Sequence, residues 1–175
     1  MNNIAFKQLE LETLLEITNT LIEHEHVDDL LQDILIRTCG ILDASCGFIL
    51  IEKKNSDLFI PKAVFNLDEK VLSKIIFNKK RGFLNVLATQ QEKFACNAIE
   101  NNHLEKLEKS FALAAPIMGK NQLLGSIIIF DKELRNGMSD FSAADAAMLS
   151  AISVQASVAY NNTFLLDTLL DSKRF

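Results

Sequence analysis

The chain has 175 residues, of which 49% are hydrophobic and 23% are charged, and this apolar content is enough for the core of one domain. The formal net charge of -5 argues against partners such as nucleic acid or anionic lipid, which a negative field repels. No apolar run approaches the roughly 20 residues of a membrane helix, and the N-terminus lacks a signal-peptide profile, so we expect a cytoplasmic protein without membrane insertion.

Two amphipathic helices are predicted at the start of the chain. Apolar residues recur three and four positions apart from Ile4 to His24, and the same spacing returns from Val27 to Asp43. A short polar stretch separates the two runs. We therefore expect residues 1–26 to form a signalling or dimerisation helix ahead of the domain.

Four apolar runs predict the strands of a sheet. Cys46–Ile51 is continuous, as in a central strand, and a turn signal connects it to a hairpin partner at Leu58–Phe65. Pro61 has no N–H for a ladder hydrogen bond, so it predicts an edge position or a bulge. Phe111–Met118 and Leu123–Phe130 flank a tight turn and predict a second antiparallel hairpin.

The segment between the two hairpins has weaker signals. A short helix is expected at Leu67–Phe77, a brief segment at Phe83–Ala88 and a short strand at Lys93–Cys96. Residues 97–109 are predicted to form a polar loop with a helical turn.

A long helix is predicted from the sequence that follows Phe141. Ser142 is a suitable N-cap, Asp145 has the spacing of a capping box, and Phe141 precedes them as a hydrophobic staple. One face of this helix comprises Leu149, Ile152, Ala156, Ala159, Thr163, Leu166 and Leu170. A second face comprises Met148, Ala151, Val158, Leu165 and Leu169. We expect one face to pack on the sheet and the other on a second helix.

The order of elements predicts an α+β (α/β) fold, a central and mostly antiparallel sheet of five to six strands with the N- and C-terminal helices on one face. Residues 111–130, the stretch Phe141-Ser-Ala-Ala-Asp145 and the alanine-rich helix after it resemble the C-terminal half of a GAF domain. Val27–Glu52 is similar to the opening helix and first strand of the same family. The resemblance implies a GAF/PAS-like domain at 27–160 and a helical extension at 161–175 toward an output domain.

Cyclic-nucleotide-binding members of the family carry a spaced Asn-Lys, Phe and Asp-Glu signature. It aligns with Asp131-Lys132, Phe141 and Asp145-Ala146, so the lysine, the phenylalanine and one aspartate match. The resemblance implies a salt bridge between Lys132 and Asp145 that joins the exit of the last strand to the final helix. Asp131 and Ala146 depart from the pattern, which argues against a cyclic nucleotide as the ligand.

Thiol chemistry and metal binding are the alternatives to a binding function. Some GAF-like proteins reduce free methionine sulfoxide with cysteine thiolates, but Cys39 and Cys46 lie in apolar runs that predict core packing. Cys96 alone could be reactive, because it ends a short strand at a loop. His24 and His26 are two residues apart and diverge on a helix, so we predict no metal site. The sequence shows no Ser-His-Asp order and no nucleotide-binding glycine loop, so we predict no catalytic residue.

The resemblance, together with strand alternation, implies a ligand cavity between the sheet and the middle segment; any cofactor remains unknown. Its expected lining comprises Phe48, Leu50, Phe65, Val86, Phe94, Asn97, Ser110 and Ala112. A register shift of one residue would exchange such a set for the opposite face. The alternative is that these side chains fill the core.

We therefore expect a regulatory sensor domain of a bacterial signal-transduction protein. It would bind a small molecule or a partner and transmit its state through a homodimer of its terminal helices. One alternative is a ligand-free scaffold that dimerises through Leu149, Ile152, Ala156, Ala159, Leu166 and Leu170. The other is a thiol redox enzyme of the free methionine sulfoxide reductase type.

Overall fold

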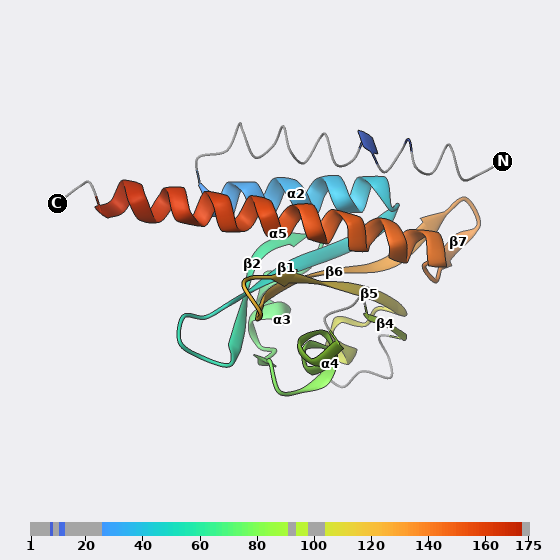
Figure 1. Cartoon of the computed structure of the whole chain (residues 1–175). Coiled ribbons are helices and arrows are strands. Elements are labelled where there is room, and N and C mark those ends of the chain that lie inside the picture. The colour runs from blue at the N-terminus through green and yellow to red at the C-terminus, as the bar shows by residue number, and fades with distance from the viewer. Residues whose placement is uncertain (1–7, 9–10, 13–25, 91–93, 98–103, 173–175) are drawn as a thin grey trace.

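A computed structural model describes residues 8, 11–12, 26–90, 94–97 and 104–172 (Figure 1). The helix that was expected at the N-terminus lies largely outside these residues. None of the described helices is both long enough and apolar enough to cross a membrane.

The described residues form one antiparallel sheet of seven strands. Six follow the order β3-β2-β1-β6-β5-β4, and the short β7 pairs with β6. Every pairing is antiparallel, which confirms the predicted type of sheet. The strands are β1 (Ala44–Glu52), β2 (Leu58–Phe65), β3 (Phe77–Asn78), β4 (Phe94–Asn97), β5 (Phe111–Met118), β6 (Leu123–Leu134) and β7 (Gly137–Ser139).

The two central strands, β1 and β6, approach each other closely at their glycines. Gly125 pairs with Ile51, and a Cβ at Gly125 would lie 2.2 Å from the carbonyl oxygen of Leu50. A Cβ at Gly47 would lie 2.6 Å from the carbonyl oxygen of Ile128. Both positions therefore require glycine because of space rather than because of a turn.

Two helices, α2 (Val27–Ile41) and α5 (Ala143–Ser172), lie side by side on one face of the sheet (Figure 1). Their apolar faces and alternate residues of the strands form the first core, which includes Leu31, Ile49, Ile127, Leu149 and Ile152. This arrangement confirms the prediction that the two helices cover the same face.

The opposite face of the sheet carries shorter elements, α3 (Glu69–Ser73), α4 (Gly82–Gln90) and the 3-10 turn η2 (Glu105–Leu107) (Figure 1). They cover the second core, to which the strands contribute Phe48, Leu50, Ile128 and Phe130. The sheet is thus covered on both faces, and its two central strands are buried along most of their length, at Cys46–Ile51 in β1 and Gly125–Asp131 in β6.

The middle segment differs from its prediction. The helix expected at Leu67–Phe77 is limited to α3, and Phe77 belongs to β3 instead. Ile75 and Phe77 are buried whereas Ile76 is 73% exposed, so the alternation of a strand replaces helical spacing there. The brief segment expected near Phe83 is the helix α4, in which Phe83, Leu84 and Leu87 are buried.

Pro61 lies at a bulge, as the sequence predicted. Ile49 pairs with Ala63 and Leu50 pairs with Pro61, so Lys62 is the extra residue. β3 pairs only with Leu58 and Phe59, which leaves the rest of β2 at the edge of the sheet.

The N-terminus of α5 is fixed by the predicted capping box. The backbone N–H of Asp145 donates to Ser142 Oγ at 3.1 Å, and the backbone N–H of Ser142 donates to Asp145 Oδ2 at 2.8 Å. Phe141 packs against the first core, where a hydrophobic staple would place it.

The proposed dimer contact through the first apolar face of α5 is wrong for four of its six residues. Leu149, Ile152, Ala156 and Ala159 are 0% exposed, because the subunit's own core covers them. Leu166 and Leu170 are 52% and 50% exposed. Helical periodicity identifies an apolar face but does not say which element covers it.

Candidate functional site

The face of the sheet beneath α3 and α4 is filled by aromatic side chains. Phe48 lies 5.4 Å from Phe77 and 5.8 Å from Phe130, measured between ring centroids, and Phe77 meets Phe83 edge-on at 6.3 Å. These four rings are at most 3% exposed. The region expected to hold a ligand cavity is therefore a packed aromatic cluster in this structure.

Three of the expected lining residues belong to this packed region. Phe48 and Leu50 of β1 and Ala112 of β5 are at most 2% exposed and lie in the second core. Val86, on α4, is half-buried.

Phe65 lies on the other face of the sheet. It pairs with Gly47 and packs against the first core, whereas its neighbour Val64 pairs with Phe48 and packs against the second core. The sequence placed β2 in the wrong phase because the bulge at Lys62 shifts the alternation by one residue.

The remaining expected residues belong to β4 or precede β5. Phe94 and Asn97 belong to β4, and their side chains lie outside the described residues, as does that of Cys96. Ser110 is half-buried, and its backbone N–H donates to Asp131 Oδ1 at 3.0 Å.

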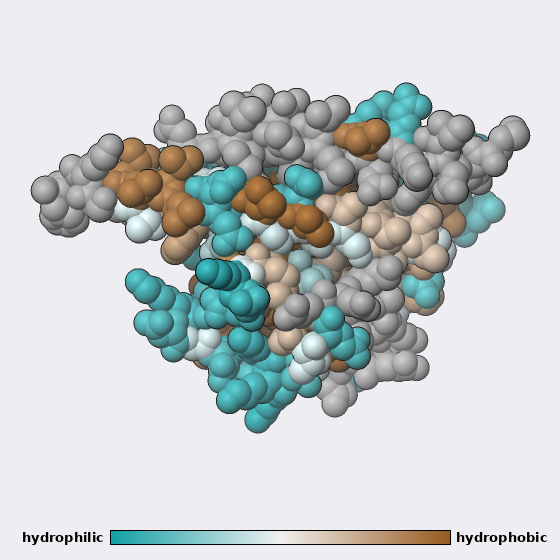
Figure 2. Space-filling model, viewed as in Figure 1, coloured by the Kyte–Doolittle hydropathy of each residue, from teal (hydrophilic) through white to brown (hydrophobic). Residues whose placement is uncertain are grey.

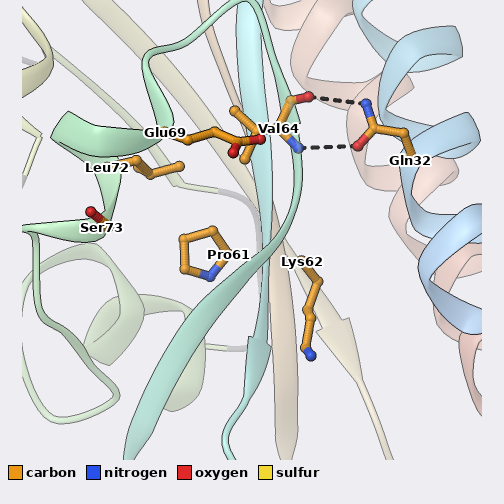
Figure 3. A pocket seen from close by; sticks show the side chains of 7 residues that line it. All are labelled: Gln32, Pro61, Lys62, Val64, Glu69, Leu72 and Ser73. Carbon is orange, nitrogen blue, oxygen red and sulfur yellow. Dashed lines mark hydrogen bonds between the residues drawn. The ribbon is translucent and has the colours of Figure 1, made fainter.

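A hollow of about 310 Å³ lies between α2, β2 and α3 (Figure 3). Gln32 of α2 forms one side, and its side chain makes two hydrogen bonds to the backbone of Val64. Nε2 donates to the carbonyl oxygen at 3.0 Å, and Oε1 accepts from the N–H at 3.2 Å. The amide of Gln32 thus satisfies part of the open edge of β2 in the way that a neighbouring strand would.

A second hollow of about 310 Å³ lies where α3 meets the paired ends of β2 and β3. Its lining includes Pro61, Leu72, Ile76 and Phe77. Charged side chains are almost missing from this lining, in which Lys53 is the one ionisable residue that the structure describes.

Cys39 and Cys46 are buried and have no disulfide partner among the described residues. Burial, with a smaller contribution from the charge of Cys46, raises the pKa of the Cys39 thiol to about 12. Burial also raises the pKa of Cys46 above its ordinary value. Neither thiol is a ready thiolate nucleophile. The described part of the chain also has no group of three or more His, Cys, Asp or Glu residues placed to hold a metal ion.

A salt bridge joins the end of β6 to the start of α5. Lys132 Nζ lies 2.9 Å from Oδ1 and 2.8 Å from Oδ2 of Asp145, and both side chains are largely buried. The same carboxylate accepts the capping hydrogen bond from the backbone N–H of Ser142. Asp145 thus connects the N-terminus of α5 to Lys132 near the end of β6. This is the pair that the family resemblance implied.

The sequence profile of the GAF domain family matches residues 26–160. The chain belongs to the GAF domain family. A comparison with curated protein sequences finds no match.

Solved structures of GAF domains share its fold. The GAF domain of a phosphoenolpyruvate-protein phosphotransferase from Coxiella burnetii is 17% identical, with a TM-score of 0.74 over 92% of this chain and 98% of that chain. The GAF domain of a putative sensor histidine kinase from Pseudomonas syringae pv. tomato is 14% identical, with a TM-score of 0.68 over 95% and 94%. The free methionine-R-sulfoxide reductase of Neisseria meningitidis, solved with its substrate, is 9% identical, with a TM-score of 0.71 over 89% and 90%.

Asp131 has a role in this GAF domain that sequence reasoning did not assign. It has a left-handed backbone with φ of 47°, is 2% exposed, and accepts the N–H groups of Ser110 and Phe111 at 3.0 and 2.7 Å. Asp131 therefore holds the backbone at the start of β5 against the C-terminal half of β6. Asp and Asn tolerate this backbone conformation and share a side-chain acceptor, which accounts for aspartate where the family signature has asparagine.

Proposed function

We propose that this GAF domain is a regulatory sensor domain of a signal-transduction protein, and that it transmits its state through its terminal helices. The observation that carries the proposal is the surface of α5. Three exposed apolar residues, Val154, Val158 and Leu165, follow one another four and seven positions apart and form what we call the outer stripe. Their exposures are 60%, 49% and 59%.

The outer stripe has the spacing of a coiled-coil seam. Steps of four and seven keep these residues on one side of the helix, away from the buried residues Leu149, Ile152 and Ala156. Figure 2 shows hydrophobic surface along α5, from its middle toward its C-terminal end, above hydrophilic hairpins. We infer that a second copy of the chain packs on this stripe and forms a homodimer, because an apolar strip of this kind favours association over exposure to water.

The ligand in this proposal is a small molecule or a partner that acts on the face beneath α3 and α4. Phe48, Leu50 and Ala112, together with Val86 and Ser110, remain the proposed contacts, along with Phe94 and Asn97 of the edge strand. Phe65 is left out, since it packs on the other face. The aromatic cluster has to rearrange before a molecule enters, so the ligand would select a minor conformation of α4.

A second candidate function is a ligand-free scaffold that serves only for dimerisation. The filled aromatic cluster favours it, because packing by the domain's own side chains leaves no preformed cavity there. In this proposal the protein functions by dimerisation through the outer stripe of α5. Cysteine chemistry is disfavoured at Cys39 and Cys46 by their burial and raised pKa.

Native mass spectrometry of the purified protein, beside its denatured mass, separates these candidates. The sensor proposal predicts a dimer that carries an added mass, and that this mass is lost on denaturation. A dimer without added mass, also after incubation with a small-molecule extract of the producing cells, would support the scaffold instead. A monomer at every concentration would contradict both.

A further inference from the structure

A groove of about 440 Å³ lies on the side of the sheet that carries α2 and α5, between the C-terminal half of α5 and two hairpin turns, and we call it the hairpin groove. One turn connects β1 to β2 and the other connects β5 to β6. Figure 2 shows a hollow between the hydrophobic C-terminal part of α5 and the hydrophilic hairpins below it. The lining comprises Glu52, Lys54, Asn55, Gly119, Lys120, Gln122, Leu124, Tyr160, Asn161, Phe164 and Leu165.

The helix side of the hairpin groove presents an aromatic surface. The rings of Tyr160 and Phe164 are stacked, with centroids 5.9 Å apart and an interplanar angle of 27°. Tyr160 is 8% exposed and belongs to the first core, whereas Phe164 is 51% exposed. One ring is thus anchored in the protein and supports another that is open to a molecule in the groove.

Glu52, at the end of β1, brings a carboxylate into the groove. Its Oε2 atom is buried and has no hydrogen-bond partner among the described residues. Burial, followed by the negative charges of Glu52 and Asp28, raises the pKa of the Tyr160 hydroxyl on the aromatic side of the groove. A buried carboxylate oxygen without a donor is costly, and a bound ammonium group would supply that donor.

The hairpin side carries positive charge. Lys54 and Lys120 are exposed, one on each turn. Within the part of the chain that the structure describes, neither is in an ion pair. The groove therefore offers a partly buried anion and two rim cations, a pattern that complements a molecule with charges of both signs.

The two walls of the groove are tied to each other. Met118 of β5 donates its backbone N–H to Ser157 Oγ at 3.0 Å, and its carbonyl oxygen accepts from Asn161 Nδ2 at 3.1 Å. Asn161 itself lines the groove. The position of α5 relative to the second hairpin is thus set before anything binds, which reduces the entropy cost of binding.

We propose that the hairpin groove binds a zwitterionic molecule with an aromatic or large apolar body, such as an aromatic amino acid. Its ammonium group donates to Glu52, its carboxylate pairs with Lys54 and Lys120, and its apolar body lies on Phe164. The volume of about 440 Å³ is that of a small-molecule site. The proposal does not rest on the sensor function above, since the groove lies on the opposite side of the sheet from the face beneath α4 and shares only Leu165 with the outer stripe.

The test is an NMR titration of the isotope-labelled chain with L-phenylalanine. Amide signals are expected to shift at residues 52–55, 119–124 and 160–165. Phenethylamine lacks the carboxylate and 3-phenylpropanoate lacks the ammonium group, so each should bind at least about tenfold more weakly. No shift in these segments up to about 10 mM, or equal affinity for all three molecules, would overturn the proposal.

Two variants make the test specific for the groove. Glu52→Gln removes the charge that holds the ammonium group and should weaken L-phenylalanine binding about tenfold. The same change removes an unpartnered buried anion, so the ligand-free variant should unfold at a higher temperature than the wild type. Lys120→Gln should weaken binding of L-phenylalanine and of 3-phenylpropanoate, with Lys70→Gln on α3 as the control that changes neither. Unchanged affinity in Glu52→Gln would contradict the assignment.

Discussion

At the scale of single residues, Asp145 in the first turn of α5 connects two elements. Asp145 accepts hydrogen bonds from Lys132 Nζ and from the backbone N–H of Ser142. The second of these belongs to the capping box of α5. Burial acts to raise its pKa, but these hydrogen bonds and the charge of Lys132 outweigh it and hold the pKa below its ordinary value of 3.8. Its ionised form is thus favoured by the folded state.

The first prediction concerns acid stability. Because the folded pKa is depressed, the stabilisation is present above the unfolded value of 3.8 and is lost as the pH falls through the lower folded value. Asp145→Asn should lower the free energy of unfolding by about 2 kcal/mol at neutral pH and should make the loss toward about pH 3 shallower. Urea unfolding followed by circular dichroism measures both.

Asp43→Asn is the matched control for this change. Asp43 is exposed, and its φ of 54° is a conformation that asparagine also adopts. The control should keep the stability and the acid response of the wild type. An Asp145→Asn variant with the same acid response as the wild type would show that the salt bridge is not linked to folding.

The sequence predicted the charged partners at this junction but not the role of Asp131. The capping box depends on a spacing of three residues, and the family resemblance implied the salt bridge between Lys132 and Asp145, so both contacts could be predicted. Asp131 binds backbone groups that are 20 and 21 residues away in the chain. No local pattern reports such a pairing, and only the left-handed backbone, seen in the structure, explains why an Asp or Asn is suitable there.

At the scale of elements, the long segments that the structure describes matched their predictions and the short ones matched in part. The strand expected at Lys93–Cys96 is β4, and the expected helical turn is η2, whereas the helix expected at Leu67–Phe77 is limited to α3. The bounds predicted for β2 and β5 agree with the structure, because each is an apolar run with clear turns. β3 has two residues and exists through its pairing with β2, so tertiary contact rather than local pattern creates it. Of the expected lining residues, Phe48 and Leu50 of β1 lie beneath α3 and α4, whereas the bulge in β2 places Phe65 on the other face.

The second prediction tests the contact between α2 and the edge of β2 (Figure 3). Gln32→Ala leaves the N–H and carbonyl groups of Val64 without their partner and should lower the free energy of unfolding by about 1 to 2 kcal/mol. Gln32→Glu should cost at least as much, because a carboxylate can accept from the N–H but presents an oxygen to the carbonyl. Chemical denaturation measures both.

Gln90, exposed at the end of α4, provides the control for these changes. Gln90→Ala should leave the free energy of unfolding within about 0.5 kcal/mol of the wild type. If Gln32→Glu were as stable as the wild type, then Nε2 would not be donating to Val64 in solution.

At the scale of the whole molecule, the sheet separates two surfaces for which we propose different tasks. The face beneath α3 and α4 is filled by aromatic side chains. The other face is covered by α2 and α5, and α5 carries the apolar outer stripe on its exposed side. The family fold was predictable from the order of elements, but the proposed dimer surface was not. Both faces of α5 are apolar in the sequence, and only the structure distinguishes the buried residue Ile152 from the exposed residue Val158.

The third prediction follows from that distinction. Val158→Glu places a charge on the outer stripe and should give a folded monomer. Ile152→Glu places the same charge in the core and should unfold the domain instead. Ile76→Glu, at an apolar residue that is 73% exposed on the other side of the sheet, is the matched control and should remain a dimer.

Sedimentation velocity of the wild type and of Val158→Glu tests the central claim most directly, since transmission through the terminal helices requires two copies of α5 to meet. The account predicts a wild-type dimer and a variant that sediments as a monomer while its circular dichroism stays native. A wild type that is monomeric at every concentration, or a Val158→Glu variant that remains an unaltered dimer, would contradict it.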